Sequence, residues 1–136
     1  MLRPLSPYVL ILGLFVILGI NGIAYWKHLY FFVWWLDIPV HFISGAWLAM
    51  AILGIVASHP RLSGVRRDPF IAFVFTVGVV MIIGVLWELF EFRIDTLVRF
   101  APHDLEDTLS DLLCDFLGGI IGSIGVLVLR YTDRDV

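Results

Sequence analysis

The sequence is poor in charged residues and in cysteine, and each deficit excludes a class of protein. Only 15% of its 136 residues are charged and 60% are apolar, whereas an ordinary soluble domain is about 45–50% apolar. A chain this short has too little interior to hide so many apolar side chains from water. Its one cysteine excludes an intramolecular disulfide and a cysteine-built zinc site. The net charge of −3 argues against a nucleic-acid partner. We therefore expect an integral membrane protein.

Four long segments without charged residues predict helices that span the lipid bilayer. A hydrocarbon core of about 30 Å needs about 20 helical residues. Three of the segments have that length, and the fourth, at 116–129, reaches it only if its helix begins near Leu105. The sequence thus predicts one all-α domain, a bundle of four transmembrane helices over residues 8–26, 39–58, 70–92 and 105–130.

Residues 28–36, between the first two predicted spans, are dense in aromatic side chains. Tryptophan and tyrosine collect at the headgroup level of membranes, which favours an interfacial segment. The same residues could instead begin a long second helix that is kinked at Pro39. Both interpretations stay open.

The distribution of lysine and arginine predicts the orientation of the bundle. With four spans, the two termini and the loop at 59–69 share one side of the membrane and carry six of the nine basic residues. Cytoplasmic segments are enriched in lysine and arginine. We therefore expect a multi-pass cell-membrane protein with both termini in the cytoplasm.

Acidic residues gather on the opposite, outward side of the predicted topology. They recur at helical spacing, so that each group shares one helix face. One group lies at the start of the second span, one at the end of the third and one at the start of the fourth: Asp37 with His41, then Glu88 with Glu91, then Asp107, Asp111 and Asp115. We expect these faces to converge on one outward-facing acidic pocket.

Carboxylates at membrane depth need partners, because an unpaired charge in hydrocarbon costs several kcal/mol. Oxygen ligands with one imidazole suit a hard divalent cation such as Mg²⁺ or Mn²⁺. In an enzyme, the catalytic candidates are His41 as general acid or base, Glu88 and Asp111. A hydrogen-bonded structural network is the alternative, and Asp107 could simply favour the N-terminus of its helix. The predicted metal ligands are Asp37, Glu88, Glu91, Asp107, Asp111 and Asp115.

Glycines spaced for close helix packing lie within the fourth span. Small residues four apart let two helices approach each other. Gly118, Gly119 and Gly122 have this pattern, and Gly78 and Gly84 on the third span are possible counterparts. The same glycine-rich faces could instead join copies of the chain in a homo-oligomer.

Two motifs resemble families of small polytopic membrane proteins. The patterns Asp37-x-x-x-His41-Phe-x-x-Gly45 and Asp107-x-x-x-Asp111-x-x-x-Asp115 resemble the VanZ-like proteins, in which an asparagine often stands where Asp115 stands. Trp87-Glu88 and the Asp107-Thr-Leu-Ser-Asp111 segment are similar to the YjdF-like inner-membrane proteins. The first resemblance implies a part in teicoplanin resistance for some members, without an established reaction.

The segment from Glu88 to Asp95 also resembles bacterial diacylglycerol kinase, whose acidic residues hold metal–ATP at the cytoplasmic face. The acidic pocket is expected on the other side, which disfavours ATP. We therefore expect a cell-envelope protein that acts as a metal-dependent enzyme on a lipid or lipid-linked phosphate. The alternatives are a cation or proton transporter, an ion-binding protein, and a small structural subunit.

Overall fold

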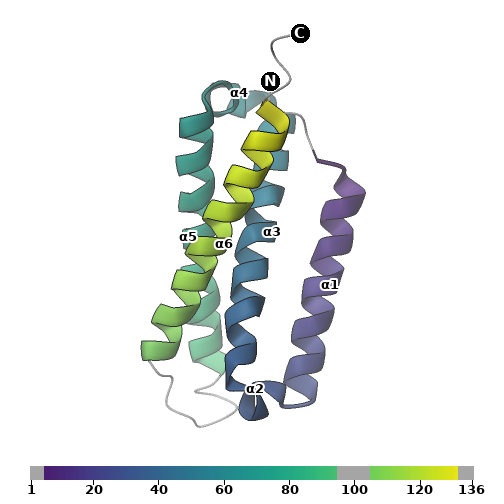
Figure 1. Cartoon of the computed structure of the whole chain (residues 1–136), viewed down its shortest axis with the longest axis vertical. Coiled ribbons are helices and arrows are strands. Elements are labelled where there is room, and N and C mark those ends of the chain that lie inside the picture. The colour runs from purple at the N-terminus through teal and green to yellow at the C-terminus, as the bar shows by residue number, and fades with distance from the viewer. Residues whose placement is uncertain (1–4, 95–104, 132–136) are drawn as a thin grey trace.

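The computed structural model describes residues 5–94 and 105–131, which form an all-α bundle (Figure 1). Four of its helices are long and apolar enough to cross a membrane. The described residues contain no strand. The predicted fold class is confirmed, and the chain is a multi-pass membrane protein. The four long helices are α1 (Pro7–Trp26), α3 (Asp37–Ser58), α5 (Pro69–Ile94) and α6 (Leu105–Tyr131).

The aromatic-rich segment between the first two spans is separate from both of them. It contains a short helix, α2 (Leu29–Phe32), and a 3₁₀ turn, η1 (Trp34–Leu36), at one end of the bundle, which we call the α2 end (Figure 1). Val33, with φ −128° and ψ 74°, interrupts the helical backbone between them. Since α3 begins only at Asp37, Pro39 lies in its first turn, where no intrahelical hydrogen bond is lost. The segment is therefore not an extension of the second span.

Helix α1 is attached to the rest of the bundle at two levels. Towards its start, the Trp47 indole N–H donates to the Leu10 carbonyl oxygen at 3.1 Å. Near its end, the Tyr30 hydroxyl donates to Asn21 Oδ1 at 2.7 Å. Most large apolar side chains of α1 are exposed, as expected for a helix surrounded by lipid.

A capped turn starts the third span. Asp68 Oδ1 accepts hydrogen bonds from the backbone N–H groups of Phe70, at 2.8 Å, and Ile71, at 3.1 Å. Pro69 is the first helical residue, a position where its missing N–H has no helical partner to lose. The predicted polar loop before it contains η2 (Pro60–Leu62) and α4 (Ser63–Arg67).

Helices α3 and α6 run in the same direction and pack backbone to backbone (Figure 1). A Cβ atom at Gly45 would lie 2.5 Å from the Asp115 carbonyl oxygen, and one at Gly122 would lie 2.5 Å from the Ala46 carbonyl oxygen. Gly118 faces the Phe42 carbonyl in the same way. Glycine is therefore required at these three positions for the two helices to approach so closely, as the glycine spacing predicts.

Helix α5 runs antiparallel to α6 and packs on another face of it. A Cβ atom at Gly119 would lie 3.1 Å from Val80, and one at Gly84 would lie 2.7 Å from a carboxylate oxygen of Asp115. The expectation for Gly78 is wrong, because no atom lies within 4 Å of its Cβ position among the described residues. The glycines of α6 therefore contact two other helices of the same chain, with Gly118 and Gly122 against α3 and Gly119 against α5.

The apolar core of the bundle lies towards the end opposite α2. This placement leaves the α2 end of the three-helix contact to polar side chains. The buried residues of the apolar core come from α3, α5 and α6: Ala49, Ile52, Leu53, Val56, Ala57, Ala72, Val80, Val126 and Leu127.

Candidate functional site

The alternating direction of the long helices brings all three acidic groups to the α2 end. Asp37 and His41 lie in the first two turns of α3, and Glu88 and Glu91 lie in the last turns of α5. The aspartates of α6 occupy its first three turns. Helical spacing turns each group towards the others, since residues three or four apart share a face. Asp95 and Asp104 lie outside the described residues.

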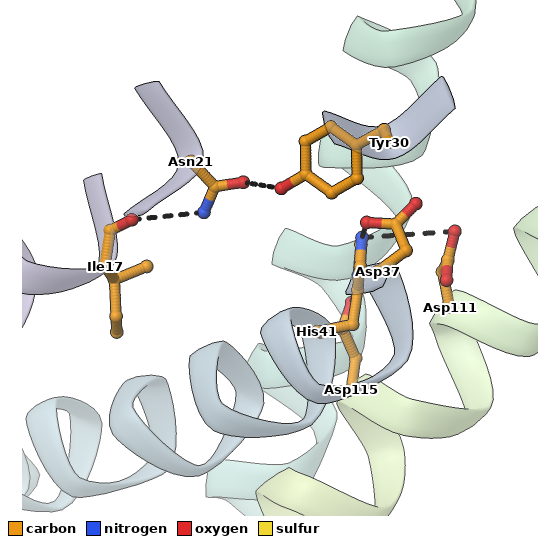
Figure 2. Close-up of polar contacts among 7 residues, drawn as sticks. All are labelled: Ile17, Asn21, Tyr30, Asp37, His41, Asp111 and Asp115. Atoms are coloured by element: carbon orange, nitrogen blue, oxygen red, sulfur yellow. Dashed lines mark hydrogen bonds and ion pairs between the residues drawn. The ribbon is translucent and has the colours of Figure 1, made fainter. Parts of the chain in front are cut away.

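His41 stands at the centre of the cluster, between α3 and α6 (Figure 2). Its Nε2 lies 3.6 Å from Asp37 and 3.9 Å from Asp111, and its Nδ1 lies 3.4 Å from Asp115. The side chains of His41, Asp111 and Asp115 are all buried. Three carboxylates thus surround one imidazole, which orients the ring from both of its nitrogen atoms.

Asp115 occupies a recess formed by two glycines. Its backbone lies against Gly45 of α3, and its carboxylate lies against Gly84 of α5. A methyl group at either glycine would overlap Asp115. The carboxylate approaches the Nδ1 side of His41, whereas Asp37 and Asp111 lie on the Nε2 side. The spacing of Gly45 and Gly84 in the sequence gives no sign that they make room for a carboxylate.

Two groups of side chains could each hold a cation. The inner set contains His41, Glu88, Glu91 and Asp111, and the rim set contains Asp37, Asp107 and Asp111. Within each set, one ligand atom from every residue lies within 4.8 Å of the others. The expected convergence of α3, α5 and α6 side chains is confirmed by this geometry.

Asp111 belongs to both sets, so one carboxylate joins the two positions. It is 3% exposed, whereas Asp107 in the rim set is exposed and lies in the first turn of α6. Asp115 belongs to neither set. Five of the six predicted metal ligands therefore belong to a set that could hold a cation. The sixth, Asp115, lies on the Nδ1 side of His41.

The carboxylates of the cluster outnumber its one imidazole. Like charges confined at this distance repel each other strongly where water is scarce. Bound protons or cations would offset this repulsion, and the two sets offer places for cations.

A cavity of about 180 Å³ opens beside the cluster, between α1, α3 and α5. His41 and Asp115 form part of its wall, so the cavity and the carboxylate cluster share two side chains. Most of the remaining wall is apolar. The cavity was not predicted from the sequence, although Asn21, an amide within an apolar span, is the kind of residue that marks a polar contact inside a membrane. Other lining residues are Leu14, Leu18, Ser44, Leu48, Ile83 and Trp87.

Comparison with known proteins places the chain in a family. Residues 3–134 match the sequence model of a family described as predicted membrane proteins, DUF2238. Searches of curated proteins and of solved structures each gave no significant match. Because the family match covers nearly the whole chain, the protein belongs to the DUF2238 family of predicted membrane proteins.

Proposed function

We propose that the protein is a divalent-cation-dependent enzyme that acts on a lipid or lipid-linked phosphate. The observation that carries the proposal is the sharing of Asp111 by the inner set and the rim set. A carboxylate common to two donor sets can bridge two cations, and two-metal phosphoryl-transfer sites hold their ions about 3.5–4 Å apart. The donors are mostly carboxylate oxygens, which Mg²⁺ and Mn²⁺ prefer.

Neither set by itself completes the coordination of a cation. The inner set offers four ligand atoms and the rim set three, whereas Mg²⁺ takes six ligands in an octahedron. Waters or substrate oxygens would fill the remaining positions. Phosphate oxygens are well suited, since protein-bound Mg²⁺ is often held by a few carboxylates together with substrate phosphates.

His41 is the residue best suited to move a proton at this centre. It lies in the inner set and in the cavity wall, and three carboxylates orient its ring. In the proposed reaction the carboxylates of the two sets would hold the cations, which would polarise the phosphoryl group. Water would attack phosphorus as the bond to the leaving oxygen breaks, and His41, when not bound to a cation, would give a proton to the leaving oxygen and regain one from the attacking water. We further propose that the α2 end faces outward and that the resemblance to VanZ-like and YjdF-like proteins reflects a cell-envelope role.

One observation favours cation or proton passage as a second candidate function. Thr76 and Ser123 are fully buried, and their hydroxyls have no hydrogen-bond partner among the described residues. Ser123 lies eight residues, or about 12 Å, further along α6 than Asp115. The backbone contact between Gly118 and Phe42 separates the two levels, so we rank passage below catalysis. Flux of Mn²⁺ into proteoliposomes would reverse this ranking.

The metal centre is tested by thermal unfolding of the detergent-purified protein. After treatment with EDTA, millimolar Mn²⁺ or Mg²⁺ should raise the Tm of the wild type. A cation at 100 times its Kd stabilises the folded state by about 2.7 kcal/mol. Asp111→Asn keeps the shape of the side chain and removes the charge shared by both sets, so it should abolish this rise.

Glu106→Gln is the matched control on the same helix. Glu106 is exposed and belongs to neither set, so its variant should respond to cations as the wild type does. If the wild type shows no cation-dependent change in Tm, the cluster is a hydrogen-bonded network and not a metal centre. A second assay tests the reaction itself. The wild type should release inorganic phosphate from phosphatidic acid in vesicles, and Asp111→Asn should not.

A further inference from the structure

We propose that the cavity between α1, α3 and α5 binds one hydrocarbon chain of a phosphate-bearing membrane lipid, whose phosphate lies at the carboxylate cluster. This inference names the substrate class and rests on the proposed function. Side chains such as Leu14, Leu18 and Ile83 make most of the cavity wall apolar. For comparison, an apolar protein cavity of about 150 Å³ stays dry and binds benzene.

The direction of the cavity matches that of a lipid chain. Its wall on α3 extends from Val40 to Leu48, which is about 12 Å along the helix. Leu48 lies eleven residues, or about 16 Å, from Asp37 at the start of α3. This distance is half of a hydrocarbon core of about 30 Å. With Asp37 at the hydrocarbon boundary, the cavity would run from the level of the cluster to the middle of the membrane, as a chain of the adjoining leaflet does.

The attachment of α1 leaves the cavity accessible from the side. Among the described residues, α1 packs mainly on α3 and has no extensive contact with α5. Its two hydrogen-bonded attachments involve Leu10 and Asn21. Leu14, Ile17 and Leu18, which line the cavity, lie between these two levels. A chain can thus enter from the bilayer between α1 and α5 without crossing polar residues.

The polar end of the cavity joins the chain site to the cation site. His41 is 4% exposed, lines the cavity and belongs to the inner set. A lipid whose chain fills the cavity therefore has its polar linkage beside the carboxylates. The carboxylates repel a phosphate when no cation is present. Cations remove this repulsion and accept phosphate oxygens as ligands, so lipid binding should depend on the cation.

Photolabelling tests both parts of the inference. The probe is phosphatidic acid with a diazirine in one acyl chain, diluted into phosphatidylcholine vesicles that contain the protein. With Mn²⁺, labelling of Ser44 and Ile83 should exceed that with EDTA several-fold. Diacylglycerol with the same diazirine chain should label them equally in both conditions. Leu86 provides the reference, because it is 59% exposed on α5 and does not line the cavity.

A matched pair of α1 variants tests the place of binding. Leu18→Trp extends a cavity-lining side chain and should reduce labelling of Ile83 several-fold. Leu12→Trp places the same residue on α1 at an exposed position outside the cavity wall, so its labelling should equal that of the wild type. If Leu18→Trp does not fold, Ser44→Leu fills the cavity from the opposite wall.

The outcomes separate the two proposals. Labelling of Ile83 that matches Leu86 and is insensitive to Leu18→Trp overturns the chain site. Labelling that is lost in Leu18→Trp but is independent of Mn²⁺ and of the phosphate overturns the assignment of a phosphate-bearing lipid. In that second case, a wild-type Tm that does not respond to cations shows that the proposed cation-dependent function is wrong. A wild-type Tm that rises with the cation shows that only the assignment of a phosphate-bearing lipid is wrong.

Discussion

Substitution of Gly122 by alanine should destabilise the protein by forcing α3 and α6 apart. The added Cβ would lie 2.5 Å from the Ala46 carbonyl oxygen and 2.9 Å from its Cα. Both atoms belong to the backbone, so a side-chain rotation cannot relieve the overlap. The helices must separate until the contact approaches the 3.4 Å at which ordinary van der Waals contact begins.

The expected loss follows from the packing of this interface. A gap of about 0.5–1 Å forfeits a quarter to a half of the dispersion energy of each contact across it. Overpacking of a well-packed core typically destabilises by about 1–3 kcal/mol. We therefore expect Gly122→Ala to lower the free energy of unfolding by that amount, and the Tm by several degrees. Thermal unfolding in detergent without added cations measures the change.

Gly125→Ala is the control on the same helix. No atom lies within 4 Å of the Cβ position of Gly125 among the described residues. Because alanine favours a helix over glycine by up to about 1 kcal/mol, this variant should be as stable as the wild type or slightly more stable. Equal Tm values for the two variants would refute the close packing of α3 on α6.

Two further predictions concern the orientation and the start of α5. In a variant without Cys114, Glu106→Cys should react with an impermeant maleimide on intact cells, and Gly64→Cys only after permeabilisation; the opposite pattern would reverse the proposed orientation. Asp68→Ala removes the acceptor of two backbone N–H groups and should destabilise by about 0.5–2 kcal/mol in thermal unfolding, whereas Asp68→Asn should retain most of the stability. Equal stability of the alanine variant and the wild type would exclude a capping role.

The four spans and the end at which the acids meet could be predicted from the sequence. Uncharged segments of about 20 residues have few structural options in a bilayer, because every backbone polar group must be satisfied internally. Consecutive spans connected by short segments must alternate in direction. This alternation brings Asp37, Glu88 and Asp111 to one end of the bundle, and helical spacing turns their neighbours inward.

The partners of individual carboxylates were decided by the tertiary structure. Asp111 and Asp115 occupy the same face of α6, and spacing alone makes them equivalent ligands. Gly45 and Gly84 let the backbones approach so closely that Asp115 is held on the Nδ1 side of His41. Asp111 is left to join the two donor sets.

The cavity was also decided by tertiary structure alone. Its wall on α1 consists mainly of leucine and isoleucine, such as Leu14, Ile17 and Leu18, and lipid-facing side chains of the same helix are of the same types. A uniformly apolar helix carries no periodic signal that separates a protein-facing side from a lipid-facing one. The hydrogen bonds that join α1 to Trp47 of α3 and to Tyr30 of α2 help to fix which of its residues face the cavity, because hydrocarbon solvates the other residues equally well.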